Sequence, residues 1–252
     1  HQNRGGPGGT ITPKTTTILM GASATFNVIP DDGYEVLDVM VDGESVGAVT
    51  TYTFDEVTIQ HSIAATFGRV FPFEDVTETD WFHSSVRYVF ESNLMTGTAE
   101  DEFNPLLATN RAMIVTILHR LEKTPEAPLG AFTDVLDGTW YTDAVAWAAA
   151  NGIAEGFGEG LFGPELSVTR EQIACFFYRY SQYAGRDISE RAPLTGFVDG
   201  DETSEWAREA MEWAVGCGLI RGKDGGVLDP TGPATRAELA TMLERFIEGN
   251  QE

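Results

Sequence analysis

Three arginines occupy the same unfavourable place in three related stretches of the sequence. The stretches read NRAMIVTILHRL, TREQIACFFYRY and TRAELATMLERF, and the arginines are Arg111, Arg170 and Arg236. Asn and Thr are good N-caps, so each arginine is predicted to be the first residue of a helix. The helix dipole disfavours a cation there by roughly 0.3–1 kcal/mol. The chemistry that would offset this cost is anion binding, because a guanidinium beside unpaired helix N–H groups matches a carboxylate.

The residue three positions after each cap differs between the stretches. Glu238 completes a capping box in the last stretch, and Gln172 preserves it in the second. Met113 cannot close the box in the first stretch. We therefore expect a weaker helix start at Asn110 and weaker ligand binding in the groove beside it.

These stretches belong to an internal repeat with a period of about 60 residues. Each copy opens with a Phe-x-Asp motif, at Phe73, Phe132 and Phe197. A tryptophan follows and heads an amphipathic helix, which ends at Asn93, Gly152 or Gly218, residues that tolerate the left-handed conformation beyond a helix. A further glycine in each copy, Gly97, Gly156 or Gly222, closes a loop before the arginine-headed helix.

The N-terminal part of the chain has a different pattern. Residues 1–10, HQNRGGPGGT, are typical of a linker, and they suggest that the chain is a fragment or a processed product. Residues 11–68 alternate apolar and polar positions in SATFNVIP, GYEVLDVMVDG and HSIAATF, which predicts a small antiparallel β-domain. The run GYEVLDVMVDGESVG, followed by YTFDEVTIQHSIAATF, resembles the divergent internalin-type B repeats that serve as spacers in bacterial surface proteins.

The composition excludes several classes of partner. The chain has 252 residues and a formal charge of −23, from 16 Lys and Arg against 39 Asp and Glu. A protein of this charge lacks the basic field that binds nucleic acid or anionic lipid. No stretch approaches the roughly 20 apolar residues of a membrane span, so membrane insertion is not expected.

The repeats resemble the S-layer homology domain of bacterial cell-surface proteins, through the F-x-D opening, the tryptophan helix, the glycine loop and the TRAE helix start. The resemblance predicts repeats at 73–128, 129–193 and 194–247, in a mainly α region folded as a pseudo-threefold bundle. It implies an extracellular location at the cell wall or S-layer and non-covalent anchoring. The implied partner is an anionic secondary cell-wall polysaccharide attached to peptidoglycan, often carrying a pyruvylated amino sugar. No cofactor and no catalysis are implied.

The resemblance also implies roles for the repeated residues. The arginines would contact the acidic substituent of the polymer. The tryptophans would pack on sugar rings or form groove walls, at Trp81, Trp140 and Trp206. The aspartates would hydrogen-bond sugar hydroxyls or the arginines, at Asp75, Asp134 and Asp199. Each set of residues also has a structural interpretation: the tryptophans as core aromatics, the aspartates as turn or loop caps, and the arginines as residues that serve the fold alone.

Other functions stay open from the residues alone. In one alternative, the repeats assemble a surface lattice through contacts with neighbouring subunits. An acidic loop at residues 198–205 is a candidate calcium site, although it lacks the ligand series of an EF-hand. Carboxylate pairs for glycoside hydrolysis are not singled out by any pattern. Cys175 and Cys217 lie in apolar helical runs and are expected to be buried free thiols, with a single bridge between them as the alternative.

Overall fold

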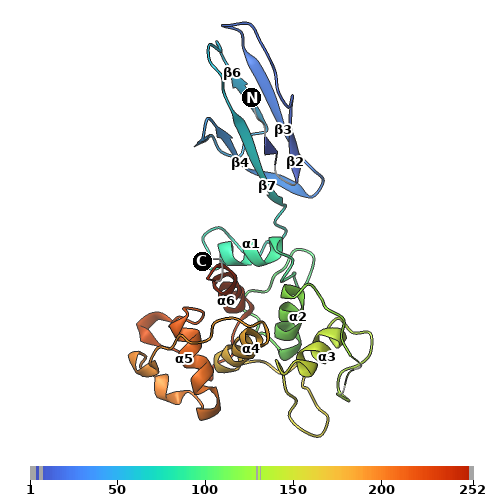
Figure 1. Ribbon diagram of the computed structural model, residues 1–252, viewed down its shortest axis with the longest axis vertical. Coiled ribbons are helices and arrows are strands. Elements are labelled where there is room, and N and C mark those ends of the chain that lie inside the picture. The colour runs from blue at the N-terminus through green and yellow to red at the C-terminus, as the bar shows by residue number, and fades with distance from the viewer. Residues whose placement is uncertain (1–3, 6–7, 129, 131, 250–252) are drawn as a thin grey trace. The chain divides into compact units, whose positions relative to one another are not determined.

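The computed structural model describes residues 4–5, 8–128, 130 and 132–249. The chain divides into two compact units, His1–Pro72 and Phe73–Glu252 (Figure 1). The first unit is built of strands and the second of helices and loops, which confirms the change of pattern after Gly68. In the described residues, no helix is long and apolar enough to cross a membrane.

The first unit contains two small sheets. One has the strand order β1-β7-β4-β5 and the other the order β2-β3-β6. The strands are β1 Arg4–Gly5, β2 Gly9–Thr12, β3 Ala24–Pro30, β4 Tyr34–Val41, β5 Glu44–Ser45, β6 Thr51–Phe54 and β7 Ile63–Arg69. The predicted alternation is clear in β3, where Phe26 and Val28 are buried and the residues beside them are exposed. Their side chains join a core that also includes Val39, Ile63 and Phe67.

One sequence prediction for this unit is wrong in part. The segment 1–10 is not simply a linker, because β1 and the start of β2 lie within it. The antiparallel pairing predicted for residues 11–68 is confirmed, because β2 to β7 pair only in antiparallel fashion within the described residues. The additional strand β1, which precedes that segment, pairs with β7 in parallel. The glycines that are typical of a linker have a packing reason here: a Cβ on Gly9 would lie 2.4 Å from the Phe67 ring. Glycine therefore lets this backbone approach the core closely.

The second unit contains two α-helices in each repeat. They are α1 His83–Glu91 and α2 Arg111–Leu121, α3 Thr142–Ala150 and α4 Arg170–Tyr183, and α5 Arg208–Gly216 and α6 Arg236–Glu248. Short 3₁₀ turns lie between them at η1 Leu194–Gly196, η2 Gly200–Glu202, η3 Glu205–Ala207 and η4 Asp224–Gly226. Each arginine is the first residue of its helix, as the caps predicted. Asn93, Gly152 and Gly218 have φ values of 56°, 68° and 74°, which confirms the left-handed ends of the first helices.

The caps follow the sequence closely. Full capping boxes are present at Thr169 with Gln172 and at Thr235 with Glu238. Asn110 accepts a 2.9 Å hydrogen bond from the N–H of Met113, and this cap has no reciprocal side-chain bond from Met113. The half-formed box predicted for the first repeat is therefore confirmed.

The three repeats are joined by a closed ring of backbone hydrogen bonds. The N–H of Thr109 donates to the carbonyl oxygen of Ala234 at 2.8 Å. The N–H of Ala234 donates to Val168 at 3.0 Å, and the N–H of Val168 donates back to Thr109 at 2.9 Å. Each residue lies just before an arginine-headed helix, so the ring brings the starts of α2, α4 and α6 together.

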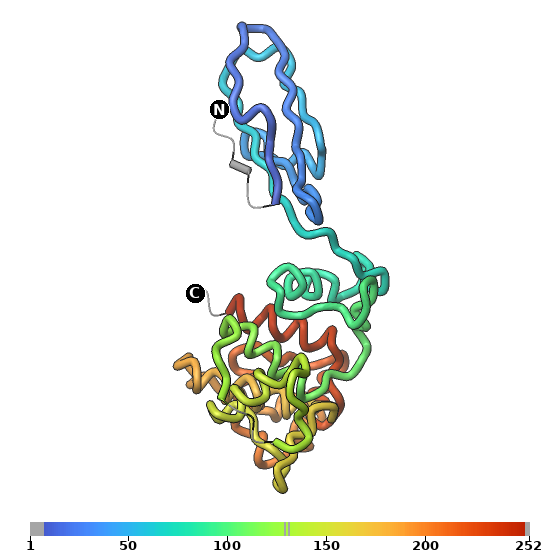
Figure 2. Tube along the Cα trace, turned by 90° about the vertical axis from the view of Figure 1, so that its right-hand side faces the viewer, coloured from blue at the N-terminus to red at the C-terminus, as the bar shows by residue number. Residues whose placement is uncertain are grey.

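The helices pack between repeats rather than within them. The main helix contacts are α2 with α3, α4 with α5, and α1 with α6. The last pair joins the two ends of the unit, and Figure 2 shows the red α6 beneath the cyan-green α1. Because the first helix of each repeat packs on the second helix of another, the repeats share one core.

Candidate functional site

The three arginine side chains are buried and bind backbone carbonyls of a neighbouring repeat. Only 3–7% of their surface is exposed. Arg111 donates to the carbonyl oxygens of Phe162 and Glu155, the first at 2.9 Å. Arg236 makes the same pair of bonds, to Phe103 at 2.8 Å and to Thr96 at 2.7 Å. The Arg236 guanidinium also lies 4.4 Å from the centre of the Phe103 ring, a cation–π contact.

Arg170 repeats this arrangement in the third pair of repeats. It donates to the carbonyl oxygens of Leu228 at 2.8 Å and Arg221 at 3.0 Å. Burial lowers the pKa of all three arginines, that of Arg236 to about 10. Arg236 is therefore cationic at neutral pH. All six bonded carbonyl oxygens belong to loop residues, so the arginines connect loops of one repeat to the helix start of another.

The expectation of unpaired N–H donors at these helix starts is wrong. The N–H of Arg236 donates to the carbonyl oxygen of Leu107 at 2.9 Å, and the N–H of Ala237 donates to Pro105 at 2.9 Å. The next N–H is taken by the cap hydroxyl of Thr235. Matching bonds occur at the starts of α2 and α4. Any anion must therefore be bound by side chains rather than by these backbone groups.

The three aspartates hold the loops from the other side. Asp75 accepts from the N–H groups of Phe103 and Asn104 at 2.8 and 2.6 Å. Asp134 binds Phe162 and Gly163, and Asp199 binds Leu228 and Asp229, in the same way. These bonds lower the pKa of Asp134 and Asp199 against the opposing effect of burial. The carboxylates are occupied by backbone, not by the arginine side chains.

The three tryptophans are exposed, unlike core aromatics. Trp81, Trp140 and Trp206 have 65%, 58% and 62% of their surface exposed. By contrast, Trp147 in α3 and Trp213 in α5 are almost completely buried. An exposed indole at one position of every repeat is a feature that stability does not require, and its flat face is suited to stacking on a ligand.

Each exposed tryptophan lines a pocket that takes residues from all three repeats. The repeat-1 pocket, of 370 Å³, is walled by the loop at Thr96 and by α2, with Trp140 and Arg236 from the other repeats. The repeat-2 pocket, of 230 Å³, is walled by the loop at Gly156 and by α4, with Trp206 and Arg111. The repeat-3 pocket, of 540 Å³, is walled by the loop at Gly222 and by α6, with Trp81 and Arg170. The structure thus brings the predicted tryptophans and arginines together in pairs.

A second arginine in each pocket was missed by the sequence analysis. The second arginine is the middle residue of the HRL, YRY and ERF triplets, and it lines the pocket of its own repeat in each case, as Arg120, Arg179 and Arg245. The shared triplet position is the signal that was available in the sequence. Arg120 donates to the carbonyl oxygen of Leu94 at 2.9 Å, and Arg179 pairs loosely with Glu155 at 3.4 Å.

The pockets are locally positive although the chain is strongly acidic. The repeat-1 pocket is lined by two arginines and no carboxylate. The repeat-2 pocket has two arginines against Glu155, and the repeat-3 pocket has four cationic side chains against Asp224 and Glu238. A flat aromatic face beside cationic donors can hold a sugar ring that carries a negative charge.

The cysteines are both free in the structure. Cys175 is half-buried in the wall of the repeat-2 pocket, and burial raises its pKa to about 11, so it is a neutral thiol. Cys217 is exposed, which corrects the expectation that both thiols are buried. It is the C-cap residue of α5.

Comparison with known proteins defines the class of the chain. The S-layer homology domain model matches residues 72–112, 131–174 and 196–240, and the chain belongs to this family. Each match contains the aspartate, the tryptophan and the arginine discussed above. The family and its surface-protein relatives indicate an extracellular location at the cell surface or cell wall.

Three relatives illustrate the range of proteins that contain similar modules. The chain is 32% identical to the surface-layer 125 kDa protein of Lysinibacillus sphaericus, over 65% of the chain and 14% of that protein. It is 27% identical to exoglucanase XynX of Acetivibrio thermocellus, over 92% of the chain and 22% of that protein. It is 25% identical to a cellulosome-anchoring protein of the same species, over 58% of the chain and 33% of that protein. The chain therefore spans a third or less of these relatives.

Proposed function

We propose that the three repeats anchor a larger surface protein non-covalently to the cell wall, by binding a pyruvylated secondary cell-wall polysaccharide in the pockets between repeats. This proposal rests on one observation: every pocket is lined by an exposed tryptophan and a buried arginine. The indole would stack on a sugar ring, and the arginine would contact the acidic substituent.

The charge distribution supports this choice of ligand. The chain as a whole repels anions, since its formal charge is −23. Moderate salt screens that field beyond roughly 8–10 Å, whereas the arginines lie within the pockets themselves. A polymer would thus be held by local contacts rather than by attraction at long range. The relatives include an S-layer protein and a cellulosome-anchoring protein, which fits a shared module for wall attachment.

We also propose that the repeats are arranged about a pseudo-threefold axis. The closed ring through Thr109, Val168 and Ala234 supports this arrangement. The cyclic exchange of tryptophans and arginines between pockets supports it as well. For the first unit, we propose a spacer of the internalin-type B class, on the basis of its two small sheets and the GYEVLDVMVDG strand and turn.

The proposal is tested by retention of the full chain on purified wall sacculi. We expect retention to be lost after extraction of the secondary polymer and to fall sharply after chemical removal of its pyruvyl groups. A variant with Trp81, Trp140 and Trp206 replaced by Ala should fold normally and fail to bind. Undiminished binding to polymer-free sacculi would contradict the proposal, and self-association on such sacculi would favour the lattice alternative.

A further inference from the structure

One helix position that lines all three pockets carries a different side chain in each of them. The third residue after the helix cap lines the pocket of its own repeat, and it is Met113 in the first, Gln172 in the second and Glu238 in the third. In each pocket, the buried arginine comes from a different repeat. In the first and third pockets, the residue at this helix position contacts the guanidinium directly.

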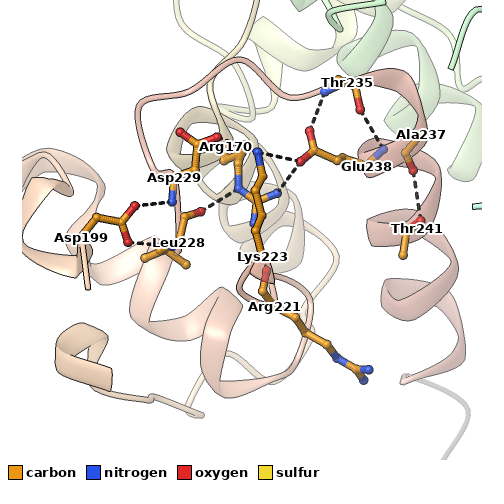
Figure 3. A network of polar contacts seen from close by, with 10 residues as sticks. All are labelled: Arg170, Asp199, Arg221, Lys223, Leu228, Asp229, Thr235, Ala237, Glu238 and Thr241. Carbon is orange, nitrogen blue, oxygen red and sulfur yellow. Dashed lines mark hydrogen bonds and ion pairs between the residues drawn. The ribbon is translucent and has the colours of Figure 1, made fainter. Parts of the chain in front are cut away.

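In the repeat-3 pocket, a carboxylate of the protein already occupies the arginine. Oε1 of Glu238 accepts from Nη1 of Arg170 at 3.1 Å, with only 4% of the arginine side chain and 12% of the glutamate side chain exposed. Nζ of Lys223 lies 3.1 Å from the same oxygen and 2.6 Å from Asp229. Figure 3 shows this network, in which Glu238 also accepts from the N–H of Thr235. An incoming anion would have to displace Glu238 from two cations.

In the repeat-1 pocket, the matching group is not charged. Nη1 of Arg236 faces the sulfur of Met113 at 3.9 Å, and a thioether is a weak acceptor. The lining of this pocket contains Arg120 as a second cation and no carboxylate. The Nε and Nη2 groups of Arg236 are held by carbonyl oxygens, which fixes the orientation of the remaining edge. A desolvated cation without a carboxylate partner favours an anion from outside.

The repeat-2 pocket is intermediate. Gln172 is neutral, and its amide oxygen accepts from the N–H of Thr169 at 3.1 Å. Nη1 of Arg111 has no hydrogen-bond partner among the described residues. However, the carboxylate of Glu155 also lines this pocket and pairs with Arg179 at 3.4 Å, so part of the positive charge is offset.

We propose that the acidic substituent binds preferentially in the repeat-1 pocket, with Nη1 of Arg236 as its cationic contact, and that Glu238 excludes it from the repeat-3 pocket. This inference rests on the proposed function and assigns its pockets unequal roles. The third residue after the cap is then the residue that determines anion specificity. The sequence alone predicted weaker binding in the groove beside Asn110, because the only property of Met113 visible there was that it cannot complete a capping box.

The experiment uses the tryptophans as one reporter for each pocket. The full chain, labelled with ¹⁵N at its indoles, is titrated with a pyruvylated amino sugar and with the same sugar lacking the pyruvyl group. Its five indole signals are assigned by Trp→Phe variants. We expect the pyruvylated sugar to shift the signal of Trp140 at the lowest concentration and that of Trp81 only weakly or not at all. The unmodified sugar should show no preference for Trp140.

Two reciprocal variants test the role of the third residue. Met113→Glu should weaken binding at Trp140 roughly tenfold or more, because it places a carboxylate against Arg236. Met113→Gln is the matched control, with the same chain length as glutamate and no charge, and should retain binding. Glu238→Gln should open the repeat-3 pocket, so that Trp81 now responds. This variant keeps the cap, since Gln172 already forms such a cap with Thr169.

The outcomes separate the two proposals. Equal or stronger binding at Trp81 in the unmodified chain would overturn the inference, as would unchanged binding in Met113→Glu, while the proposed function would stand. If no indole signal responds to the pyruvylated sugar in any variant, both proposals fail. Thermal melting of each variant shows whether it is folded, and Met113→Glu is expected to melt no earlier than the unmodified chain.

Discussion

Asp75 and Arg236 bind the two backbone polar groups of the same residue, Phe103. The N–H of Phe103 donates to Oδ1 of Asp75 at 2.8 Å, and its carbonyl oxygen accepts from Nε of Arg236 at 2.8 Å. Asp75 belongs to the first repeat and Arg236 to the third, so the loop at Phe103 is a joint between repeats. Asp134 with Arg111 at Phe162, and Asp199 with Arg170 at Leu228, form the same joint.

The joint predicts that Arg236→Ala destabilises the fold. The change leaves two carbonyl oxygens without their donor and removes the cation–π contact with Phe103, at a cost of roughly 2–4 kcal/mol. Lysine cannot reach both carbonyls with a planar fork, so Arg236→Lys should recover less than half of the loss. Denaturant unfolding at neutral pH measures both variants. Arg208→Ala is the control, because its ion pair with Glu205 is exposed and should change stability little.

Trp140→Ala should separate binding from stability. More than half of this side chain is exposed, so we expect a loss of less than about 1 kcal/mol in the free energy of unfolding. Retention on wall polymer should nevertheless fall. Trp147→Ala is the matched control: this side chain is 2% exposed, and its removal should cost roughly 3–5 kcal/mol. Comparable destabilisation by the two variants would show that Trp140 is a core residue.

The backbone hydrogen bonds to Asp199 predict that the stability of the fold decreases as the pH becomes acidic. The N–H of Leu228 lowers the pKa of Asp199, burial opposes this, and the N–H of Asp229 adds to the lowering. A carboxyl whose pKa is lowered by folding stabilises the protein fully above its unfolded pKa of about 3.9, and this stability is lost as the pH falls through the folded pKa. Asp199→Asn should therefore melt earlier at pH 7, and the difference should shrink below about pH 3.9. A difference that is constant from pH 7 to pH 2 would argue against this role.

Gly97→Ala should disturb the wall of the repeat-1 pocket. An added Cβ would lie 2.4 Å from the carbonyl oxygen of Ala99 and 2.6 Å from the Phe73 ring, so the loop must shift, at a cost of about 1–3 kcal/mol. We expect a lower thermal midpoint and weaker binding at Trp140. Gly196→Ala serves as the control, since no atom lies within 4 Å of its added Cβ. Equal midpoints for the two variants would show that the loop has room.

Much of this protein was determined by local sequence. The repeat period, the two helices of each repeat, the caps of the three arginine-headed helices and the left-handed residue at Asn93 follow from turn, cap and periodicity rules that act over a few residues. The strands at Ala24–Pro30 and Ile63–Arg69 follow from alternation in the same way. The pairing of an aspartate, a tryptophan and an arginine in every repeat was also visible, because the three copies repeat it.

Only the tertiary structure decided where those residues point. The arginine at the start of α6 was interpreted as a cation awaiting an anion, but its nearest partners are the carbonyl oxygens of Phe103 and Thr96, far away in the sequence. Sequence rules cannot find such partners, because backbone carbonyls carry no side-chain signal. The tertiary structure also decided that Glu238, besides capping its own helix, neutralises Arg170, whereas Met113 leaves Arg236 open. A pocket shared by three repeats has properties that no single repeat contains.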